Sequence, residues 1–170
     1  MDDSGLPDAA DGFDPMAPIA PPNLRFTDAK GTKLSLAGYK THVLVVNLWA
    51  SWCGPCVEEL PTLAALGQQI QTFGGLVLPI SIDAGGAAAV RPFYERHAIT
   101  SLPILLDPDG DNLDVLDTDG VPVTLVIDPL GRQVARLDGA ANWNTPRIRA
   151  FLKSLLPVQD SPAPAHIMAL

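Results

Sequence analysis

The sequence predicts an α/β protein whose central mixed sheet is flanked by helices. Two continuous apolar runs, residues 43–48 and 76–82, have the length and composition of buried strands. Each run is followed by a stretch with helical spacing of apolar residues, at 57–73 and 87–97. Buried strands that alternate with helices indicate a sheet covered by helices rather than an all-β or all-α protein.

The two ends of the chain are expected to lie outside the folded domain. Residues 1–21 hold four prolines, many acidic residues and little periodic apolar content, which predicts a disordered linker. Residues 158–170 contain two further prolines and predict a flexible tail. We therefore expect one domain over residues 22–157, long enough to bury a sizeable core.

The first elements of this domain follow from local patterns. Residues 23–27 and 32–36 alternate apolar and polar side chains around a short turn, which predicts a β-hairpin ahead of the first buried strand. In the helix at 57–73, Pro61 should produce a kink. In the second buried run, Pro79 favours an edge position or a bulge.

The C-terminal half supplies the remaining elements. A short strand is predicted at 103–106, and two antiparallel strands at 121–127 and 133–137. A last helix should begin at Pro146, with Asn144 or Thr145 as its cap. The predicted order is an extra hairpin followed by βαβαββα.

Charge and targeting patterns limit the function classes. The net charge of −8 argues against nucleic-acid binding, which needs a basic face. No run approaches the ~18 apolar residues of a membrane span, and no basic segment followed by an apolar one indicates a signal peptide. The acidic, proline-rich start is nevertheless typical of a linker behind a removed signal or anchor. A cytosolic protein with a disordered front is the alternative.

Both cysteines lie in the motif Trp52-Cys53-Gly54-Pro55-Cys56, directly behind the first buried strand. Two thiols three positions apart at the start of a helix share one face and can close a small disulfide. The helix N-terminus should lower the pKa of the Cys53 thiol below ~8.5, making Cys53 the nucleophile and Cys56 the resolving residue. A permanent stapling disulfide and half of a metal site are the alternatives. Because no histidine lies at zinc spacing from the cysteines, we expect no metal and no cofactor beyond the disulfide.

Residues 43–61, VLVVNLWASWCGPCVEELP, resemble the thioredoxin superfamily, and within it the membrane-anchored or periplasmic TlpA/ResA-like branch. The resemblance covers residues 22–157. It implies a thioredoxin fold with an extra N-terminal β-hairpin and a redox-active Cys53–Cys56 disulfide. It also implies that Trp52, Gly54 and Pro55 contact the substrate.

The resemblance further implies a cis-proline that faces the cysteines. Pro122 fits this position better than its rival Pro103, and Val121 would present its backbone to a bound polypeptide. In this family a helix usually precedes the cis-proline loop. Here residues 112–119 fill that place with alternating acids and few helix formers.

A third implication concerns the acid of the site. Thioredoxins carry a buried aspartate where this chain has Asn47, and in the TlpA/ResA-like branch the acid is instead the residue that corresponds to Glu59. Burial near the thiols would raise the pKa of Glu59 so that it exchanges protons near neutral pH. The alternative is that Glu58 and Glu59 merely favour the first turn of the helix.

The expected function is a thiol:disulfide oxidoreductase of the cell envelope, either periplasmic or membrane-anchored. It would reduce disulfides of proteins of the cytochrome c or copper-site maturation type, take electrons from a membrane thiol donor and act as a monomer. A disulfide oxidant or isomerase, and a copper-binding chaperone with thiol ligands, are the alternatives. A peroxidase fits less well, because peroxiredoxins lack the Trp-Cys-x-x-Cys core.

Overall fold

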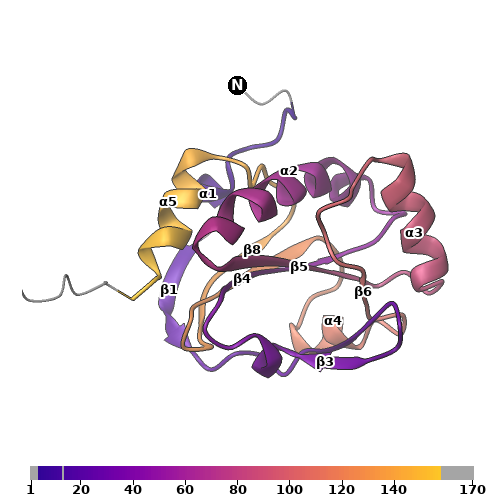
Figure 1. Ribbon diagram of the computed structural model, residues 1–170, viewed down its shortest axis with the longest axis horizontal. Coiled ribbons are helices and arrows are strands. Elements are labelled where there is room, and N and C mark those ends of the chain that lie inside the picture. Colours follow the sequence, from indigo (N-terminus) through magenta and orange to yellow (C-terminus); the bar gives the residue numbers. More distant parts are fainter. Residues whose placement is uncertain (1–3, 13, 158–170) are drawn as a thin grey trace, which may run out of the picture.

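An eight-stranded mixed sheet in the order β1-β8-β7-β4-β5-β6-β2-β3 forms the centre of the computed structural model, which describes residues 4–12 and 14–157 (Figure 1). β4 and β5 pair in parallel, whereas β7 pairs antiparallel with both β4 and β8. The mixed sheet therefore agrees with the predicted fold class. The strands are β1 (Asp14–Ile19), β2 (Arg25–Asp28), β3 (Lys33–Ser35), β4 (Val43–Trp49), β5 (Gly75–Ser81), β6 (Leu105–Leu106), β7 (Val123–Ile127) and β8 (Gln133–Asp138).

Helices cover both faces of this sheet. Figure 1 shows α1, α2 and α5 on one face, with α4 and the segment from β2 to η1 on the other. No helix in the described ranges is long and apolar enough to cross a membrane. The helices are α1 (Ala9–Gly12), η1 (Leu36–Tyr39), α2 (Gly54–Ile70), η2 (Gln71–Phe73), α3 (Ala87–Arg96), α4 (Asp111–Val115) and α5 (Pro146–Ser154).

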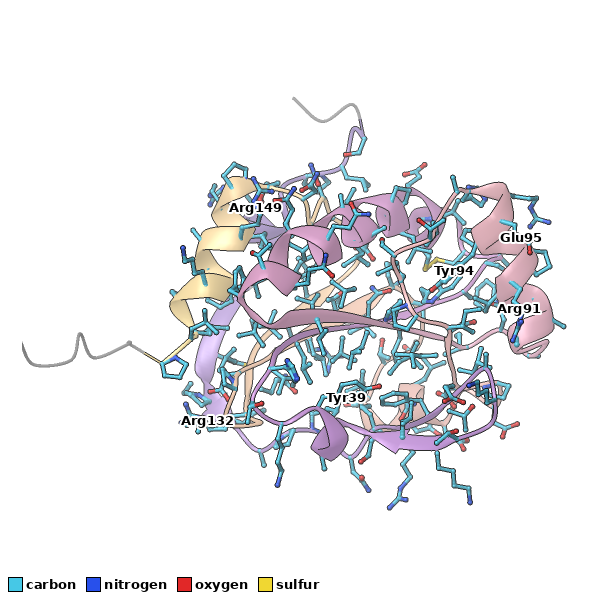
Figure 2. The ribbon with its side chains drawn as sticks, in the orientation of Figure 1. Tyr39, Arg91, Tyr94, Glu95, Arg132 and Arg149 are labelled. Atoms are coloured by element: carbon cyan, nitrogen blue, oxygen red, sulfur yellow. A yellow bond between two sulfur atoms is a disulfide. The ribbon has the colours of Figure 1, made fainter. Side chains whose placement is uncertain are left out.

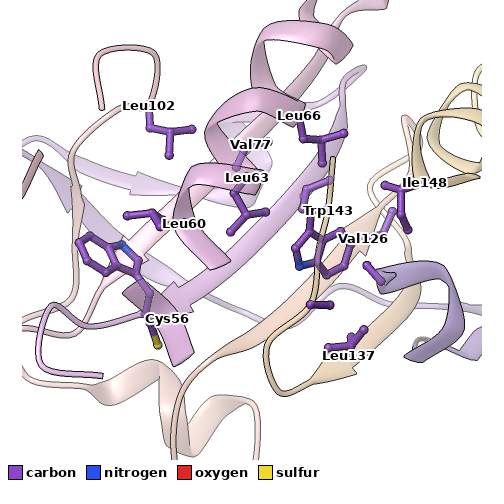
Figure 3. Packing of buried hydrophobic residues seen from close by; sticks show 14 of the residues in the cluster. Cys56, Leu60, Leu63, Leu66, Val77, Leu102, Val126, Leu137, Trp143 and Ile148 are labelled. Carbon is purple, nitrogen blue, oxygen red and sulfur yellow. The ribbon is translucent and has the colours of Figure 1, made fainter. Parts of the chain in front are cut away.

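The continuous apolar run in β4 is explained by burial on both sides. Val43, Val45 and Trp49 pack in the cluster under α2 and α5, whereas Leu44, Val46 and Leu48 pack in the cluster on the opposite face. Figure 3 shows that the first cluster also contains Cys56 and Trp143. The N-terminal end of α2, which carries Cys56, is thus built into the main core.

α3 shows the predicted amphipathic pattern. Val90, Phe93 and Tyr94 are buried, and the Tyr94 hydroxyl donates to the Pro103 carbonyl at 2.9 Å. In Figure 2, Arg91 and Glu95 extend from the outer side of the same helix. The helix therefore turns one face to the sheet and leaves its charged residues in solvent.

The N-terminal segment differs from the predicted disordered linker over 1–21. In its described part, α1 places Ala9 in the core with no exposed surface, and β1 pairs antiparallel with β8. Prolines did not prevent this pairing because β1 is an edge strand, where a missing N–H is tolerated. Residues 1–3 and 13, and the tail predicted at 158–170, lie outside the described residues.

The predicted hairpin is confirmed as β2 and β3. Pro79 does not place β5 at an edge of the sheet, since β5 lies between β4 and β6. However, Ile80 and Ser81 are the only residues of β5 that pair with β6. Pro79 therefore occupies a part of β5 that pairs with β4 alone. The short β6 explains how an inner strand accommodates a proline.

Two helix starts depend on side-chain acceptors. α4 overlaps the stretch at 112–119 that holds few helix formers, and the Asp107 carboxylate supports its start by accepting the backbone N–H groups of Asp111 and Asn112. α5 is capped by Thr145, whose hydroxyl accepts the Ile148 N–H, so Thr145 rather than Asn144 is the cap.

Candidate active site at the start of α2

The two cysteines lie where the chain leaves the end of β4 and enters α2. Cys53 is the N-cap of α2 and is disulfide-bonded to Cys56. The Cys56 N–H donates to Cys53 Sγ at 3.2 Å, which explains why the helix begins at Gly54, earlier than predicted. Cys53 is 7% exposed and Cys56 is 1% exposed. The first cysteine is therefore the more accessible of the two, in the order that the motif predicts.

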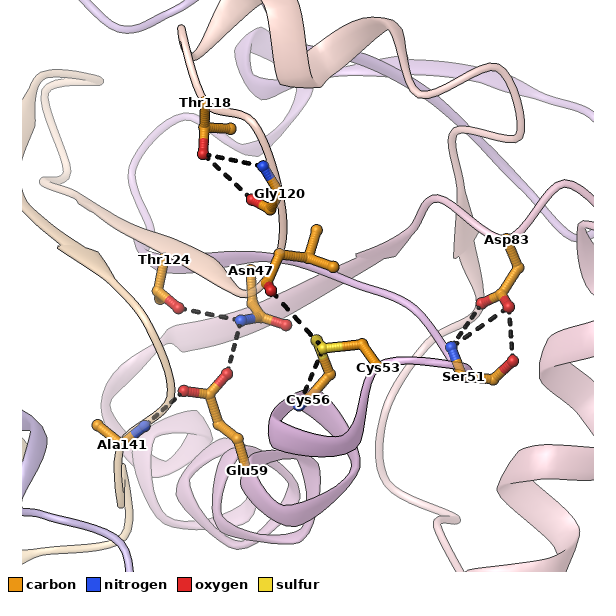
Figure 4. Close-up of a disulfide and its surroundings, with 11 residues drawn as sticks. Asn47, Ser51, Cys53, Cys56, Glu59, Asp83, Thr118, Gly120, Thr124 and Ala141 are labelled. Carbon is orange, nitrogen blue, oxygen red and sulfur yellow. Dashed lines mark hydrogen bonds between the residues drawn. A yellow bond between two sulfur atoms is a disulfide. The ribbon is translucent and has the colours of Figure 1, made fainter.

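The loop before β7 faces this disulfide. The Val121–Pro122 bond is cis, and Pro122 rather than Pro103 is the cis-proline of the described chain. Cys53 Sγ lies 3.6 Å from the Val121 carbonyl oxygen (Figure 4). The predicted cis-proline loop and the predicted nucleophile are thus in contact.

Exposed residues surround the disulfide. Trp52 is 69% exposed, and Gly54 and Pro55 are exposed beside it. Val121 is half-buried at the facing loop. These residues offer an apolar side chain and backbone groups to an approaching polypeptide, and their part in substrate binding remains a prediction.

Glu59 lies on α2 behind the disulfide and is 1% exposed. Its Oε1 accepts from Asn47 Nδ2 at 3.0 Å, while its Oε2 accepts from the Ala141 N–H at 2.8 Å and the Trp143 indole N–H at 3.0 Å. Burial raises the pKa of Glu59 from 4.5 to about 7, against the lowering effect of these three hydrogen bonds. A carboxyl group with that pKa can take up and return protons at neutral pH.

Asn47 connects this carboxylate to β7 of the sheet. Its amide nitrogen donates both to Glu59 and to the Thr124 hydroxyl at 3.0 Å. Its Oδ1 is buried and has no hydrogen-bond partner among the described residues. In Figure 4 the amide of Asn47 lies between Glu59 and the disulfide. An unused acceptor can accept a hydrogen bond from a protonated carboxyl group or from a thiol.

A second buried carboxylate, Asp83, was not found from the sequence. It follows β5, and it accepts from the Ser51 N–H at 3.0 Å, the Ser51 hydroxyl at 2.5 Å and the Ser81 hydroxyl at 2.6 Å. Ser51 directly precedes Trp52, so Asp83 fixes the turn that carries Trp52 and Cys53. The sequence could have indicated this contact. Ser51 follows β4 and Asp83 follows β5, and parallel strands such as these end at the same edge of a sheet.

Trp143 also has a larger part than the sequence indicated. Residues 142–144 carry no motif that predicts a functional role. The indole N–H instead donates to Glu59. In the described part of the chain, no three His, Cys, Asp or Glu side chains are grouped as a metal site of three such ligands requires.

Comparison with known proteins gives these features a family context. The model of the AhpC/TSA family matches residues 19–135. The thiol-disulfide oxidoreductase ResA of Bacillus subtilis (strain 168) is 28% identical over 118 residues, which are 69% of this chain and 65% of that protein. This chain thus spans slightly less than two thirds of that relative. ResA of Geobacillus kaustophilus (strain HTA426) is 29% identical over 136 residues, 80% of this chain and 76% of that protein.

A solved structure supports the architecture. A secreted thiol-disulfide isomerase from Corynebacterium glutamicum matches with a TM-score of 0.69 at 20% identity, over 84% of this chain and 92% of that chain. The match confirms the predicted thioredoxin fold, in which a mixed sheet is flanked by helices and preceded by additional N-terminal strands. The two ResA relatives agree with the predicted resemblance to the TlpA/ResA-like branch and with the predicted enzyme class.

Proposed function

Because this chain belongs to the AhpC/TSA family within the thioredoxin superfamily, we propose that it is a thiol-disulfide oxidoreductase that reduces disulfides of cell-envelope proteins. The observation that carries the proposal is the Cys53–Cys56 disulfide at the N-terminus of α2, with Cys53 against the Val121 carbonyl. An accessible sulfur at a helix N-terminus is suited to attack, and a buried sulfur behind it is suited to resolution.

The reaction begins from the reduced pair. The Cys53 thiolate attacks one sulfur of the substrate disulfide, the substrate S–S bond breaks, and the first substrate thiolate leaves. Cys56 then passes its proton to the Glu59 carboxylate and attacks Cys53 Sγ, which releases the second substrate thiolate. The substrate gains two electrons and two protons, and the Cys53–Cys56 disulfide is restored. A membrane dithiol donor would reduce this disulfide again.

The surface around the pair favours a polypeptide substrate. The exposed Trp52 offers an apolar contact, and the half-buried Val121 offers main-chain groups to an extended segment. Contacts of this kind carry little sequence specificity. Proteins of the cytochrome c or copper-site maturation type are the substrates that the resemblance implies.

The similarity to ResA and to a protein described as secreted supports a place outside the cytoplasm. The same site would serve a disulfide oxidant or isomerase if the pair is a strong oxidant. The named activity of the Corynebacterium glutamicum protein favours that second candidate. A copper-binding chaperone would use the same two thiols as ligands.

The reduction potential of the pair tests the direction of electron flow. We expect a value below roughly −220 mV, as for a reductase, measured in thiol buffers by tryptophan fluorescence. A value near about −120 mV would instead make the protein an oxidant or isomerase. Stoichiometric copper on the reduced protein, without rapid disulfide exchange, would favour the chaperone.

Two single-serine variants test the order of attack. Reduced Cys56→Ser should form a stable mixed disulfide with an aromatic disulfide reagent, because Cys53 remains accessible and nothing resolves the product. Cys53→Ser should react far more slowly, since the remaining thiol belongs to a residue that is 1% exposed. Equal labelling of both variants would contradict the assignment of Cys53 as nucleophile.

A further inference from the structure

Residues 6–10, called here the N-terminal strap, lie along the loop at 139–145 that follows β8. The Asn142 N–H donates to the Pro7 carbonyl at 2.7 Å, and the Ala9 N–H donates to the Asn142 carbonyl at 2.9 Å. Asp8 and Asn142 thereby form an isolated parallel bridge. Ala9 is fully buried in the same cluster as Ala141 and Trp143. The strap is thus joined to the loop by backbone pairing and by core packing.

Side chains reinforce this junction. The Thr145 hydroxyl donates to Asp8 Oδ1 at 2.9 Å, and Asp8 Oδ1 also accepts the Ala10 N–H at 2.9 Å. Next to the strap, Asp11 and Arg147 form an exposed ion pair at 2.6 Å. The strap therefore contacts both the loop and the first turn of α5, beside which α1 lies in Figure 1.

The opposite side of the loop holds Glu59. Ala141 and Trp143 supply two of the three donors to its carboxylate, and both are direct neighbours of Asn142. Thr62 of α2 anchors the same place, because its hydroxyl accepts the Trp143 N–H at 3.1 Å and donates to the Glu59 carbonyl at 2.7 Å. The loop is accordingly held between α2 on one side and the strap on the other.

We propose that the N-terminal strap is a positioning element of the redox site, which fixes Asn142 and so keeps Ala141 and Trp143 on the Glu59 carboxylate. This inference rests on the proposed function, in which Glu59 exchanges a proton with Cys56. Without the strap, the two donors lose one of their supports, and Glu59 contributes less to the reaction of the buried sulfur.

The groups around Glu59 leave few other titrating candidates. β4 offers Asn47, β7 offers Thr124 and the loop offers Ala141 and Trp143, none of which is charged. On α2 itself the titratable neighbours are the exposed Glu58 and the two cysteines once reduced. On the far side of the loop, Asp8 and Asp11 both pair with Arg147.

The test is a double-mutant cycle on the reduction of the Cys53–Cys56 disulfide by dithiothreitol. Four proteins are compared: the full chain and a chain that lacks residues 1–12, each with and without Glu59→Gln. In this step the reagent thiolate attacks Cys53, Cys56 leaves and takes up a proton, and the second reagent thiol closes a cyclic disulfide to release Cys53. Stopped-flow tryptophan fluorescence gives the rate constant between pH 6 and 8.

We expect Glu59→Gln to lower the rate constant of disulfide reduction in the full chain. In the shortened chain the same substitution should lower the rate constant by a factor that is smaller by about twofold or more, as for residues in one hydrogen-bond network. An equal factor in both backgrounds would overturn the proposal, because the strap and Glu59 would then act independently. A Glu59→Gln variant of the full chain that reacts at the normal rate would instead overturn the proton role of Glu59, and the strap proposal with it.

Two further variants separate positioning from general stability. Asp11→Ala removes only the exposed ion pair beside the strap. In the Asp11→Ala background, Glu59→Gln should therefore slow the reduction by the same factor as in the full chain. If the shortened chain does not fold, as judged by near-ultraviolet circular dichroism, Asp8→Ala replaces it. That variant removes the Thr145 contact and the cap of α1 while keeping the rest of the chain. If Glu59→Gln slows the reduction of the Asp8→Ala protein by the same factor as in the full chain, the result would contradict the proposal.

Discussion

Two buried carboxylates, Glu59 and Asp83, stand on opposite sides of the disulfide in Figure 4, and their partners differ in kind. Glu59 accepts only N–H groups, which come from β4 and from the loop after β8. Asp83 accepts two serine hydroxyls and one N–H, all from the ends of β4 and β5. Glu59 is held by parts of the chain that are remote in sequence, whereas Asp83 ties two adjacent strand ends together.

This difference separates the proton exchange that we propose for Glu59 from the anchoring of the strand ends by Asp83. Behind the buried sulfur, burial raises the pKa of Glu59 to about 7, and the unpartnered Asn47 Oδ1 offers an acceptor for an added proton. On the other side, the short hydroxyl contacts of Asp83 are typical of strong bonds to a carboxylate and hold the turn before Trp52. Both carboxylates are buried, so burial alone does not distinguish them; they differ in the groups that hold them.

The largest expected effect is a pH dependence of stability that comes from Glu59. The pKa of Glu59 is about 7 in the folded protein, whereas its ordinary value, which applies to the unfolded chain, is 4.5. Between pH 4.5 and about 7 the folded state therefore binds a proton that the unfolded state releases. The free energy of unfolding should consequently fall as pH rises through this window, by up to about 3 kcal/mol. Urea unfolding of the oxidised protein at pH 5, 6, 7 and 8 measures the slope. Glu59→Gln should remove this fall in the free energy of unfolding, whereas Asp83→Asn should retain it. The reverse pattern would contradict the different parts that we assign to the two carboxylates.

The next effect concerns Asp83. Replacing it by alanine leaves the Ser51 N–H without its acceptor, which should lower the free energy of unfolding by about 1–3 kcal/mol. The loss should be the same at pH 6 and pH 8, since the removed contact is an anchor. Asp109→Ala, at an exposed position, is the matched control and should cost little. If the loss of unfolding free energy in Asp83→Ala changes with pH in the way expected for Glu59, Asp83 would not differ from Glu59 in the way that we describe.

The smallest effect is a displacement of the Glu59 titration. Asn47→Leu removes one donor from the carboxylate and should raise the pKa of Glu59 by about one unit or less. Thr124→Val keeps that donor, because Asn47 still reaches Glu59, and should leave the pKa in place. Carbon-13 NMR of the Glu59 carboxyl group follows the titration directly. A downward displacement in Asn47→Leu would mean that solvent entry outweighs the lost hydrogen bond.

The predictable part of the site is the part encoded locally. The cysteine motif behind an apolar strand located the disulfide, and the resemblance of residues 43–61 to the TlpA/ResA-like branch singled out Glu59. The surroundings of Glu59 could not be predicted, because Ala141 and Trp143 lie 82 and 84 residues away along the chain. Asp83 and Ser51 are 32 residues apart and meet only once β4 and β5 are paired.

The fold shows the same division. β4, β5 and the helices that follow them have strong local patterns and were predicted close to their observed bounds. The N-terminal segment carries prolines and acids that favour disorder by composition, yet its partner β8 lies over one hundred residues further on. α4 depended on one capping side chain, that of Asp107, which no helix propensity within the segment reveals.

Both outer edges of the sheet are made from the first 35 residues, since β1 closes one side and β2 with β3 closes the other. The partner of β1, β8, comes much later in the chain, so during synthesis β1 emerges long before anything it can pair with. β2 can pair at once with β3, but its other edge has no partner until β6 emerges. Until the ribosome has passed Asp138, the nascent chain exposes unpaired strand edges to its neighbours. Pro15 and Pro18 lack N–H groups and so weaken any premature pairing of β1. The composition that mimics disorder thus protects the unfinished protein from association with other chains.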